Sequence, residues 1–175
     1  WVHTCALLSD GTIRCWGRNG GGQLGDGKTN HGHADAYRVD YSPIPVEVSG
    51  ITSATELSAG GAHTCALFSR GTIECWGNDG WGQLGDGART NSSTPVEVIG
   101  ITNAIQVSEG GYYTCSLLSG GTVKCWGAGP LGSGTTDKSS TPVTVEGSLR
   151  RRPGETGYRL LRSSLPRHGR VLGND

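Results

Sequence analysis

The pattern of hydrophobic and polar positions predicts short β-strands throughout the repeating part of the chain. Apolar and polar residues alternate from Val46 to Val48, which is typical of a strand with one buried face. Residues 54–58 form a weaker candidate strand. Residues 64–68 and 72–76 flank Ser69-Arg70-Gly71, an arrangement that predicts a β-hairpin. Because no segment keeps a helical period over a useful length, we expect an all-β protein.

This strand pattern occurs three times in the chain. The segment from His3 to Gly17 returns from His63 to Gly77 and again from Tyr113 to Gly127. A glycine-rich stretch and a Pro-Val segment follow each copy. We divide the repeats at approximately 1–44, 45–94 and 95–147. Four strands in each tandem unit of about 50 residues are typical of β-propeller blades, so we expect about three four-stranded blades.

The six cysteines recur in pairs within the predicted hairpins. A type I turn followed by a left-handed glycine at Ser9-Asp10-Gly11 puts Cys5 directly opposite Cys15, at a non-hydrogen-bonded position. Cα atoms there lie about 4.5 Å apart, within reach of a disulfide. The same register pairs Cys65 with Cys75 and Cys115 with Cys125.

We therefore predict one disulfide per hairpin and an extracellular or cell-surface location, because disulfides persist in oxidising compartments. The alternative is that the cysteines are small buried side chains in a cytosolic sheet. Zinc is poorly supported, because the spacing lacks the C-x2-C pairs of common zinc sites.

The order of the motifs carries a resemblance to a known family. His-Thr-Cys-Ala-Leu, a Gly-Thr hairpin, Cys-Trp-Gly, Gly-Gln-Leu-Gly-Asp-Gly and Pro-Val follow one another at similar spacing. Over residues 1–147 the chain resembles the regulator of chromosome condensation repeat family, in its cysteine-containing bacterial form. The resemblance implies a propeller of about seven blades, so we expect a fragment whose partners include the missing blades of the full-length chain. Members of the family include a nuclear exchange factor for a small GTPase, a plant ultraviolet receptor and a secreted β-lactamase inhibitor, so the fold alone does not define a function.

Charge is distributed unevenly along the chain. The 15 basic and 15 acidic residues cancel, but residues 148–175 contain seven arginines and two acidic residues. We interpret this tail as a fourth repeat read out of frame, because a one-base shift in the codons of Val171-Leu172-Gly173 can give Cys-Trp-Gly. An ordinary disordered tail and a functional basic arm are the alternatives. We expect no nucleic acid partner, because the overall charge is balanced. We also expect no membrane insertion, because no apolar run approaches about 20 residues.

Two residue types recur at fixed repeat positions and predict structural roles. His3 and His63 share a position that Tyr113 occupies in the third copy, which favours a structural histidine between blades over a catalytic or metal-binding one. The repeated tryptophans alternate sides with their neighbours and are expected in the core between blades: Trp16, Trp76 and Trp126.

An insertion between Gly27 and Pro45 interrupts the first repeat. It contains His31-Gly32-His33-Ala34-Asp35, whose two histidines and one aspartate are capable of metal binding, although a solvated loop fits this composition better. The candidate partner-binding residues are those of the insertion together with one tryptophan of the second repeat: His31, His33, Tyr37, Tyr41 and Trp81.

These observations favour a non-enzymatic protein–protein interaction module. No nucleophile–base pair, phosphate-binding loop or carboxylate dyad is evident, so we expect no catalytic residue, metal or cofactor. The insertion and the loop from Asn78 to Gly87 are the expected contact surfaces. The alternatives are guanine-nucleotide exchange on a small GTPase, by family analogy, inhibition of a β-lactamase-type enzyme, and an enzyme whose catalytic blades lie outside this chain.

Overall fold

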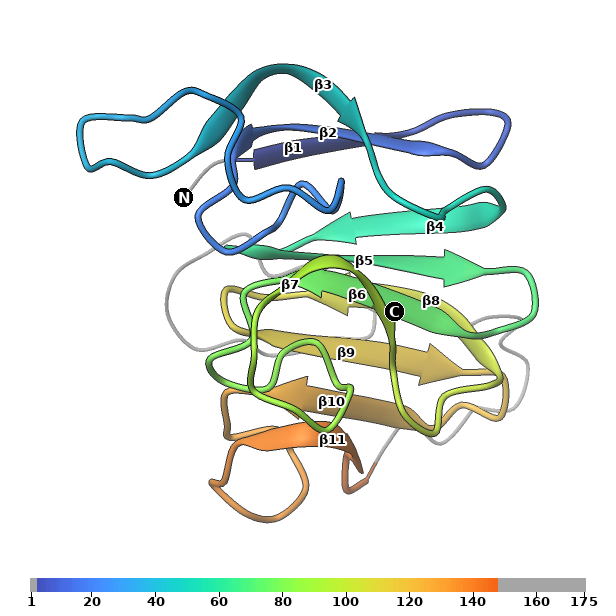
Figure 1. Ribbon diagram of the computed structural model, residues 1–175. Coiled ribbons are helices and arrows are strands. Elements are labelled where there is room, and N and C mark those ends of the chain that lie inside the picture. Colours follow the sequence, from blue (N-terminus) through green and yellow to red (C-terminus); the bar gives the residue numbers. More distant parts are fainter. Residues whose placement is uncertain (1–2, 148–175) are drawn as a thin grey trace, which may run out of the picture.

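The computed structural model describes residues 3–147, which form three antiparallel β-sheets and contain no helix. The first sheet contains β1 (His3–Leu7), β2 (Ile13–Arg18) and β3 (Tyr41–Glu47). The second contains β4 (Ala54–Ala59), β5 (His63–Phe68), β6 (Ile73–Gly77) and β7 (Ser92–Glu97). The third contains β8 (Ala104–Glu109), β9 (Tyr113–Leu118), β10 (Val123–Gly127) and β11 (Ser139–Thr144). The sheets are stacked in chain order, so the prediction of an all-β array of propeller-type blades is confirmed (Figure 1).

The bounds of the sheets differ from the bounds of the sequence units. Each Pro-Val segment pairs with the repeat that precedes it, since Val46 lies opposite Cys15 and Val96 lies opposite Cys75. The sheets therefore divide after Glu47 and Glu97 rather than at 44/45 and 94/95. A tandem repeat has no starting point of its own, and strand pairing sets the division.

The first sheet has three strands rather than the four expected of each blade. Its β1, β2 and β3 correspond to β5, β6 and β7 of the second sheet. The basic tail, residues 148–175, lies outside the described residues.

The hairpin turns set the register that joins the cysteines. The Leu8 amide donates to the Thr12 carbonyl (2.9 Å), and the Gly11 amide donates to the Leu8 carbonyl (3.0 Å). Gly11 has a φ of 81°, a left-handed conformation that glycine adopts without steric cost. Each cysteine is disulfide-bonded to the one directly opposite it, with Cα–Cα distances of 4.1, 4.0 and 4.1 Å for Cys5–Cys15, Cys65–Cys75 and Cys115–Cys125.

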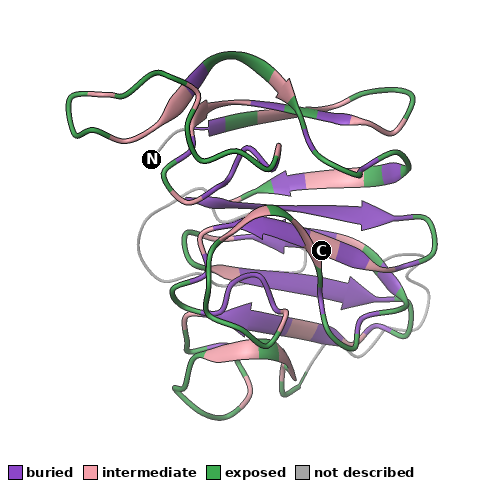
Figure 2. Ribbon diagram, in the orientation of Figure 1, coloured by how far each residue is buried: buried purple, intermediate pink, exposed green. Residues whose placement is uncertain are grey.

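Apolar side chains fill the two spaces between neighbouring sheets. Trp76 and Leu24 lie in the first of these clusters, and Trp126 and Leu84 lie in the second. Both tryptophans are completely buried. The inner strands of the second and third sheets are largely buried, whereas β3, β7 and β11 are more exposed (Figure 2).

Trp16 differs from the expectation of a core residue, because it is only partly buried. Trp76 and Trp126 each lie beneath the glycine-rich loop of the preceding sheet. No described residue forms such a loop before the first sheet, so Trp16 lies on its outer side without this cover.

Each buried indole requires glycine in the loop above it. A Cβ atom on Gly25 would lie 2.6 Å from Trp76 Nε1, and one on Gly85 would lie 2.7 Å from Trp126 Nε1. Both glycines also have positive φ, of 72° and 74°. The Gly-Gln-Leu-Gly-Asp-Gly motif is therefore the means by which one sheet packs closely on the next.

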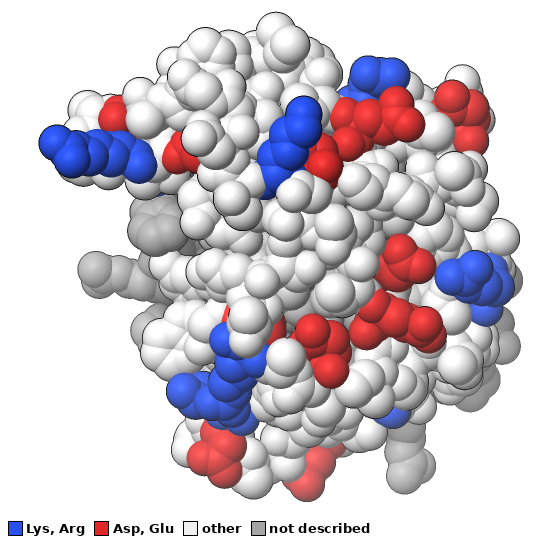
Figure 3. Space-filling model, viewed as in Figure 1, with Lys and Arg blue, Asp and Glu red and all other residues white. Residues whose placement is uncertain are grey.

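Charged side chains on the visible face of the molecule form small groups of both signs, without a continuous basic surface (Figure 3). The described residues include no helix long and apolar enough to cross a membrane.

Candidate functional site

The predicted structural histidines lie between sheets, where each takes part in the same chain of hydrogen bonds. His63 Nε2 lies 2.9 Å from Thr114 Oγ1, and the Thr114 hydroxyl donates to the Gln83 carbonyl (2.9 Å). Trp126 Nε1 donates to that same carbonyl, also at 2.9 Å. At the preceding interface His3, Thr64, Trp76 and the Gln23 carbonyl repeat the arrangement.

This arrangement fixes the donor atom of both histidines. Because the threonine hydroxyl gives its single proton to the carbonyl, the histidine must donate its Nε2 proton to the hydroxyl. Burial lowers the pKa of His63 to about 3 and that of His3 to about 4. At neutral pH both rings are therefore neutral, and Nδ1 carries no proton. His3 and His63 therefore each link one sheet to the next through a hydrogen bond.

Two long loops on one edge of the sheets form a continuous surface, which we call the loop face. It consists of residues 19–40, between β2 and β3, and residues 78–91, between β6 and β7. The loops are in contact, because a Cβ atom on Gly21 would lie 3.1 Å from the Asn78 backbone nitrogen. In Figure 1 both loops leave the left edge of the stacked sheets, opposite the three tight hairpins.

A pocket of about 390 Å³, lined by polar residues, glycines and Val39, lies between the two loops. Its lining includes Asn19, Thr29, Arg38 and Asp40 from the first loop, and Asn91 from the second. The pocket therefore combines the insertion of the first repeat with a segment of the second repeat, about 50 residues later in the chain.

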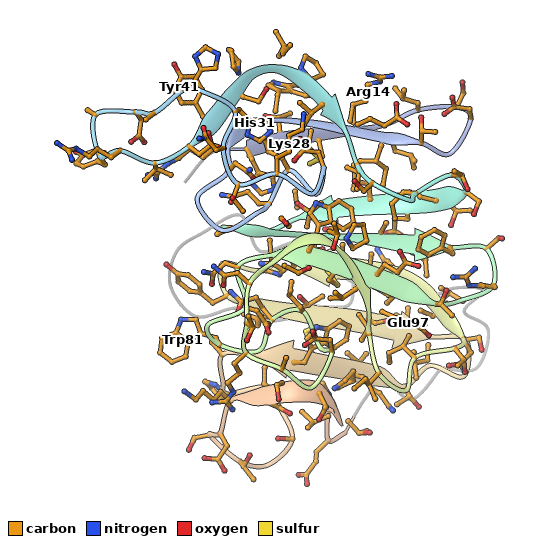
Figure 4. The ribbon with its side chains drawn as sticks, viewed as in Figure 1. Arg14, Lys28, His31, Tyr41, Trp81 and Glu97 are labelled. Carbon is orange, nitrogen blue, oxygen red and sulfur yellow. A yellow bond between two sulfur atoms is a disulfide. The ribbon has the colours of Figure 1, made fainter. Side chains whose placement is uncertain are left out.

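Aromatic side chains of the predicted contact set are exposed on the loop face. Tyr37 is 85% exposed and Trp81 is 46% exposed. Figure 4 shows Trp81 directed away from the sheets, and Lys138 Nζ lies 4.9 Å from the centroid of its ring. The ring centroids of His33 and Tyr41 lie 5.4 Å apart at the base of the insertion. The structure thus brings residues from both predicted loops to one side of the molecule.

His31 differs from the expectation of a solvated contact residue. Its side chain is only 7% exposed, and both ring nitrogens contact carboxylates. Nδ1 lies 2.6 Å from Asp40 Oδ2, and Nε2 lies 2.9 Å from Asp26 Oδ2. His31 therefore contacts other residues of its own loop rather than presenting its side chain to a partner. Among the described residues, no group of three or more His, Cys, Asp or Glu side chains is arranged to hold a metal ion.

A buried side chain braces the turn in each loop, but the two loops use different residues. In the first loop Asn19 Oδ1 accepts from the Leu24 amide (3.0 Å), and its Nδ2 donates to the Lys28 carbonyl (2.9 Å). In the second loop Asp79 Oδ1 accepts from the Leu84 amide (2.8 Å). Asp79 is completely buried, and its Oδ2 has no hydrogen-bond partner among the described residues. Burial raises the pKa of Asp79 to about 6, and the charge of Asp86 adds to this effect. The Leu84 and Thr90 amides and the charge of Arg89 oppose it.

The substitution Asp79→Asn is expected to stabilise the protein by about 1–2 kcal/mol at pH 7 and above. The asparagine amide would replace an unpaired buried carboxylate oxygen and donate to the Ala88 carbonyl, as Asn19 does to the Lys28 carbonyl. The measurement is the difference in the free energy of unfolding between variant and wild type as a function of pH. Asp79 has a folded-state pKa above its unfolded value, so its penalty exists at high pH and declines as the pH falls from about 6 towards 4. The gain must decline over the same range.

The companion variant is Asn19→Asp, which places a carboxylate beside the Lys28 carbonyl and Asp40 in the first loop and is expected to destabilise the protein. Equal stabilities of Asp79→Asn and wild type at pH 8 would show that Asp79 carries no such penalty.

Sequence reasoning identified the histidines and tryptophans of the interfaces but missed their partners. The acceptors are the Gln23 and Gln83 carbonyls, and a backbone group leaves no trace in residue type. Threonine recurs at the same repeat position, as Thr64 and Thr114, and this recurrence could have indicated a partner for the histidines. The roles of Asp26 and Asp40 were also missed, because their contacts with the ring of His31 occur in only one of the three repeats.

Stacked antiparallel sheets, bonded through a repeated His–Thr–Trp arrangement and displaying long loops on one edge, define a propeller-type repeat protein. The sequence profile of the Regulator of chromosome condensation (RCC1) repeat matches residues 10–67 and 71–117, and the chain belongs to this family.

The proteins that are similar in sequence to this chain are much longer than it is. The chain is 41% identical over 83 residues to the human probable E3 ubiquitin-protein ligase HERC3, a match that covers 47% of this chain and 7% of that protein. It is 36% identical over 88 residues to the ultraviolet-B receptor UVR8 of Arabidopsis thaliana, covering 50% of this chain and 18% of the receptor. The chain thus spans less than a fifth of the length of these relatives.

Solved structures show the same fold. Human WBSCR16 superposes with a TM-score of 0.68 at 24% identity, covering 82% of this chain and 35% of that one. Prp20p of Saccharomyces cerevisiae superposes with a TM-score of 0.66 at 18% identity, covering 82% and 36%.

Proposed function

We propose that this chain is a non-enzymatic protein-interaction module whose contact surface is the loop face. The observation that carries the proposal is that two loops from successive repeats form one surface, on which Tyr37 and Trp81 are exposed. Large aromatic side chains on a polar, ordered surface are typical centres of protein–protein interfaces. The pocket between the loops adds a recess beside these aromatic anchors.

The state of the histidines supports binding rather than catalysis. His3 and His63 are neutral, buried and bonded to threonine, and His31 is held between two carboxylates. None of the three has a ring nitrogen facing the pocket as a general base would need. The family also supports the proposal, because the structurally similar protein Prp20p binds Gsp1p and histones.

We further propose an extracellular or cell-surface location for the module. All six cysteines of the chain are in disulfides, and disulfides are rare in reducing compartments. The test is mass spectrometry of thiol-alkylated protein purified from the cells that produce it. Six free thiols would contradict this location.

The substitutions Tyr37→Ala and Trp81→Ala are each expected to weaken partner binding by about tenfold or more, because truncating an interface anchor costs about 1–2 kcal/mol or more. Thermal stability should change little, since both side chains are exposed. The measurement is the dissociation constant of a partner captured with the full chain, together with the melting temperature of each variant.

The control variants are Leu8→Ala and Ile44→Ala, which shorten exposed apolar side chains outside the loop face. Binding lost in the control variants but kept in Tyr37→Ala and Trp81→Ala would place the contact elsewhere. Accelerated nucleotide release from a small GTPase, or inhibition of a β-lactamase, that persists in Tyr37→Ala and Trp81→Ala would favour the corresponding alternative function.

A further inference from the structure

The insertion of the first repeat is fastened by a single buried group of titratable residues. We infer that Asp26, His31 and Asp40 form a pH-sensitive clasp, which holds residues 28–34 closed against the Gly-Asp-Gly turn at acidic to neutral pH and releases them at alkaline pH. This inference rests on the proposed function only in its consequence for binding, because the clasp shapes one wall of the loop face.

The geometry of the clasp is that of an imidazolium between two carboxylates. The ring nitrogens of His31 lie 2.6 Å from Asp40 Oδ2 and 2.9 Å from Asp26 Oδ2. Carboxylates accept hydrogen bonds and have no proton to donate at neutral pH, so both ring nitrogens must carry a proton. The His31 amide also donates to Asp40 Oδ1 at 2.7 Å. Residue 31 is therefore fixed to Asp40 by backbone and side chain together.

The charges around the ring favour its protonated form. Burial lowers the pKa of His31, but the hydrogen bonds and charges of Asp40 and Asp26 outweigh burial and raise the pKa above its ordinary value of 6.5. Burial raises the pKa of Asp40, but the His31 amide and ring, together with Asn19, lower it below 3.8. The side chains of the clasp are 7–12% exposed, so solvent screens these interactions weakly.

The other charged groups near the clasp are Arg18, Lys28 and Arg38, of which Arg38 lines the pocket together with Asp40. Arg18 on β2 pairs with Asp35 at 3.2 Å, so this pair holds the tip of the insertion independently of His31. Lys28 contributes its backbone carbonyl, which accepts from Asn19 at 2.9 Å. From the neighbouring repeat, Ser93 contributes a backbone carbonyl to the Gly27 amide and no charge.

The sign of the pH dependence follows from the two shifts. His31 contributes its full stabilisation below pH 6.5 and loses it as the pH rises through its raised folded-state pKa. Asp40 contributes above about pH 4 and loses its contribution as the pH falls through its lowered pKa. The clasp is therefore strongest from about pH 4 to pH 6.5. Above the pKa of His31 one ring nitrogen lacks a proton and faces a carboxylate oxygen, which is repulsive.

Opening of the clasp changes the loop face directly. Asp40 forms the clasp and also lines the pocket, next to Asn19, Thr29 and Arg38. While His31 holds the loop closed, Asp40 keeps one fixed position in the wall of the pocket. We therefore expect the affinity of the loop face for its partner to decrease as the pH rises above the pKa of His31.

The test is limited trypsin digestion of the full chain between pH 6 and pH 9. The rate of cleavage after Lys28 is divided by the rate for a free peptide spanning residues 26–40 at the same pH, which removes the pH dependence of the protease. Cleavage of a transiently opened segment follows the population of the open form. We expect this ratio to rise over the range, because the closing equilibrium loses the contribution of protonated His31 as the pH passes through its raised pKa. A ratio that stays constant would overturn the inference.

Two variants and a spectroscopic measurement complete the test. His31→Gln is expected to give a high ratio that does not change with pH, whereas His33→Gln, which removes the other histidine of the same loop, should keep the wild-type profile. If His31→Gln rises with pH as wild type does, His31 is not the switch. Should that variant fail to fold, the NMR titration of the His31 ring in wild type remains decisive, because a pKa at or below 6.5 contradicts the clasp. None of these measurements needs a partner, so their failure is distinguishable from failure of the proposed function.

Discussion

Replacing Trp76 by alanine is expected to lower the free energy of unfolding by about 3–5 kcal/mol, the usual cost of truncating a buried tryptophan. The indole is completely buried between the first two sheets, and its Nε1 donates to the Gln23 carbonyl at 3.0 Å. The substitution removes the packing and leaves that carbonyl with only the longer bond from Thr64, at 3.3 Å. The measurement is equilibrium unfolding in urea, monitored by circular dichroism.

The chain offers two matched controls for Trp76→Ala. Trp16 occupies the same repeat position but is only partly buried, and Trp81 is 46% exposed on the loop face. Trp16→Ala and Trp81→Ala should therefore each cost much less than Trp76→Ala. Equal losses for all three tryptophans would contradict the account of how the sheets are joined.

Removing the disulfides is expected to lower the free energy of unfolding by about 2–3 kcal/mol for each bridge. Each bridge joins cysteines with a sequence separation of 10, so reduction frees a loop of similar length in every repeat. The loss of all three bridges is comparable with the total stability of a typical domain, which is about 5–15 kcal/mol. The measurement compares unfolding in urea with and without a reductant.

The double substitution of Cys65 and Cys75 by alanine separates one bridge from the others. Because Cys5–Cys15 closes a loop of the same length, its removal should cost a similar amount through the unfolded chain. Unchanged stability after complete reduction would show that the cysteines act only as buried side chains.

The strands and the cysteine pairing were predictable because both depend on local register. The Ser9-Asp10-Gly11 turn determines which residues face each other over the next few positions, and that is sufficient to place Cys5 opposite Cys15. The division between sheets was not predictable in the same way. Val46 pairs with Cys15 across a long loop, and a repeating sequence contains no information about which neighbour it joins.

The candidate site was predictable in its location and less so in its chemistry. The glycine-rich stretch before the insertion contacts Asn78, and the insertion shares a pocket with Asn91, because equivalent positions of adjacent repeats fall on the same edge of stacked sheets. The burial of His31 depends on how one unrepeated loop folds back onto Asp26. The unpaired Oδ2 of Asp79 results from the burial of this side chain, which residue type alone does not reveal, and Asn19 occupies the same position in the first repeat.

The central claim, that the loop face binds a protein partner, is tested most directly by site-specific photocrosslinking in the cells that produce the chain. A photoreactive side chain is placed singly at Tyr37 or Trp81 on the loop face, or at Leu8 or Ile44 outside it. The account predicts that positions 37 and 81 form an adduct with one and the same protein, while positions 8 and 44 form none. Adducts from positions 8 and 44 with no adduct from 37 and 81 would contradict it.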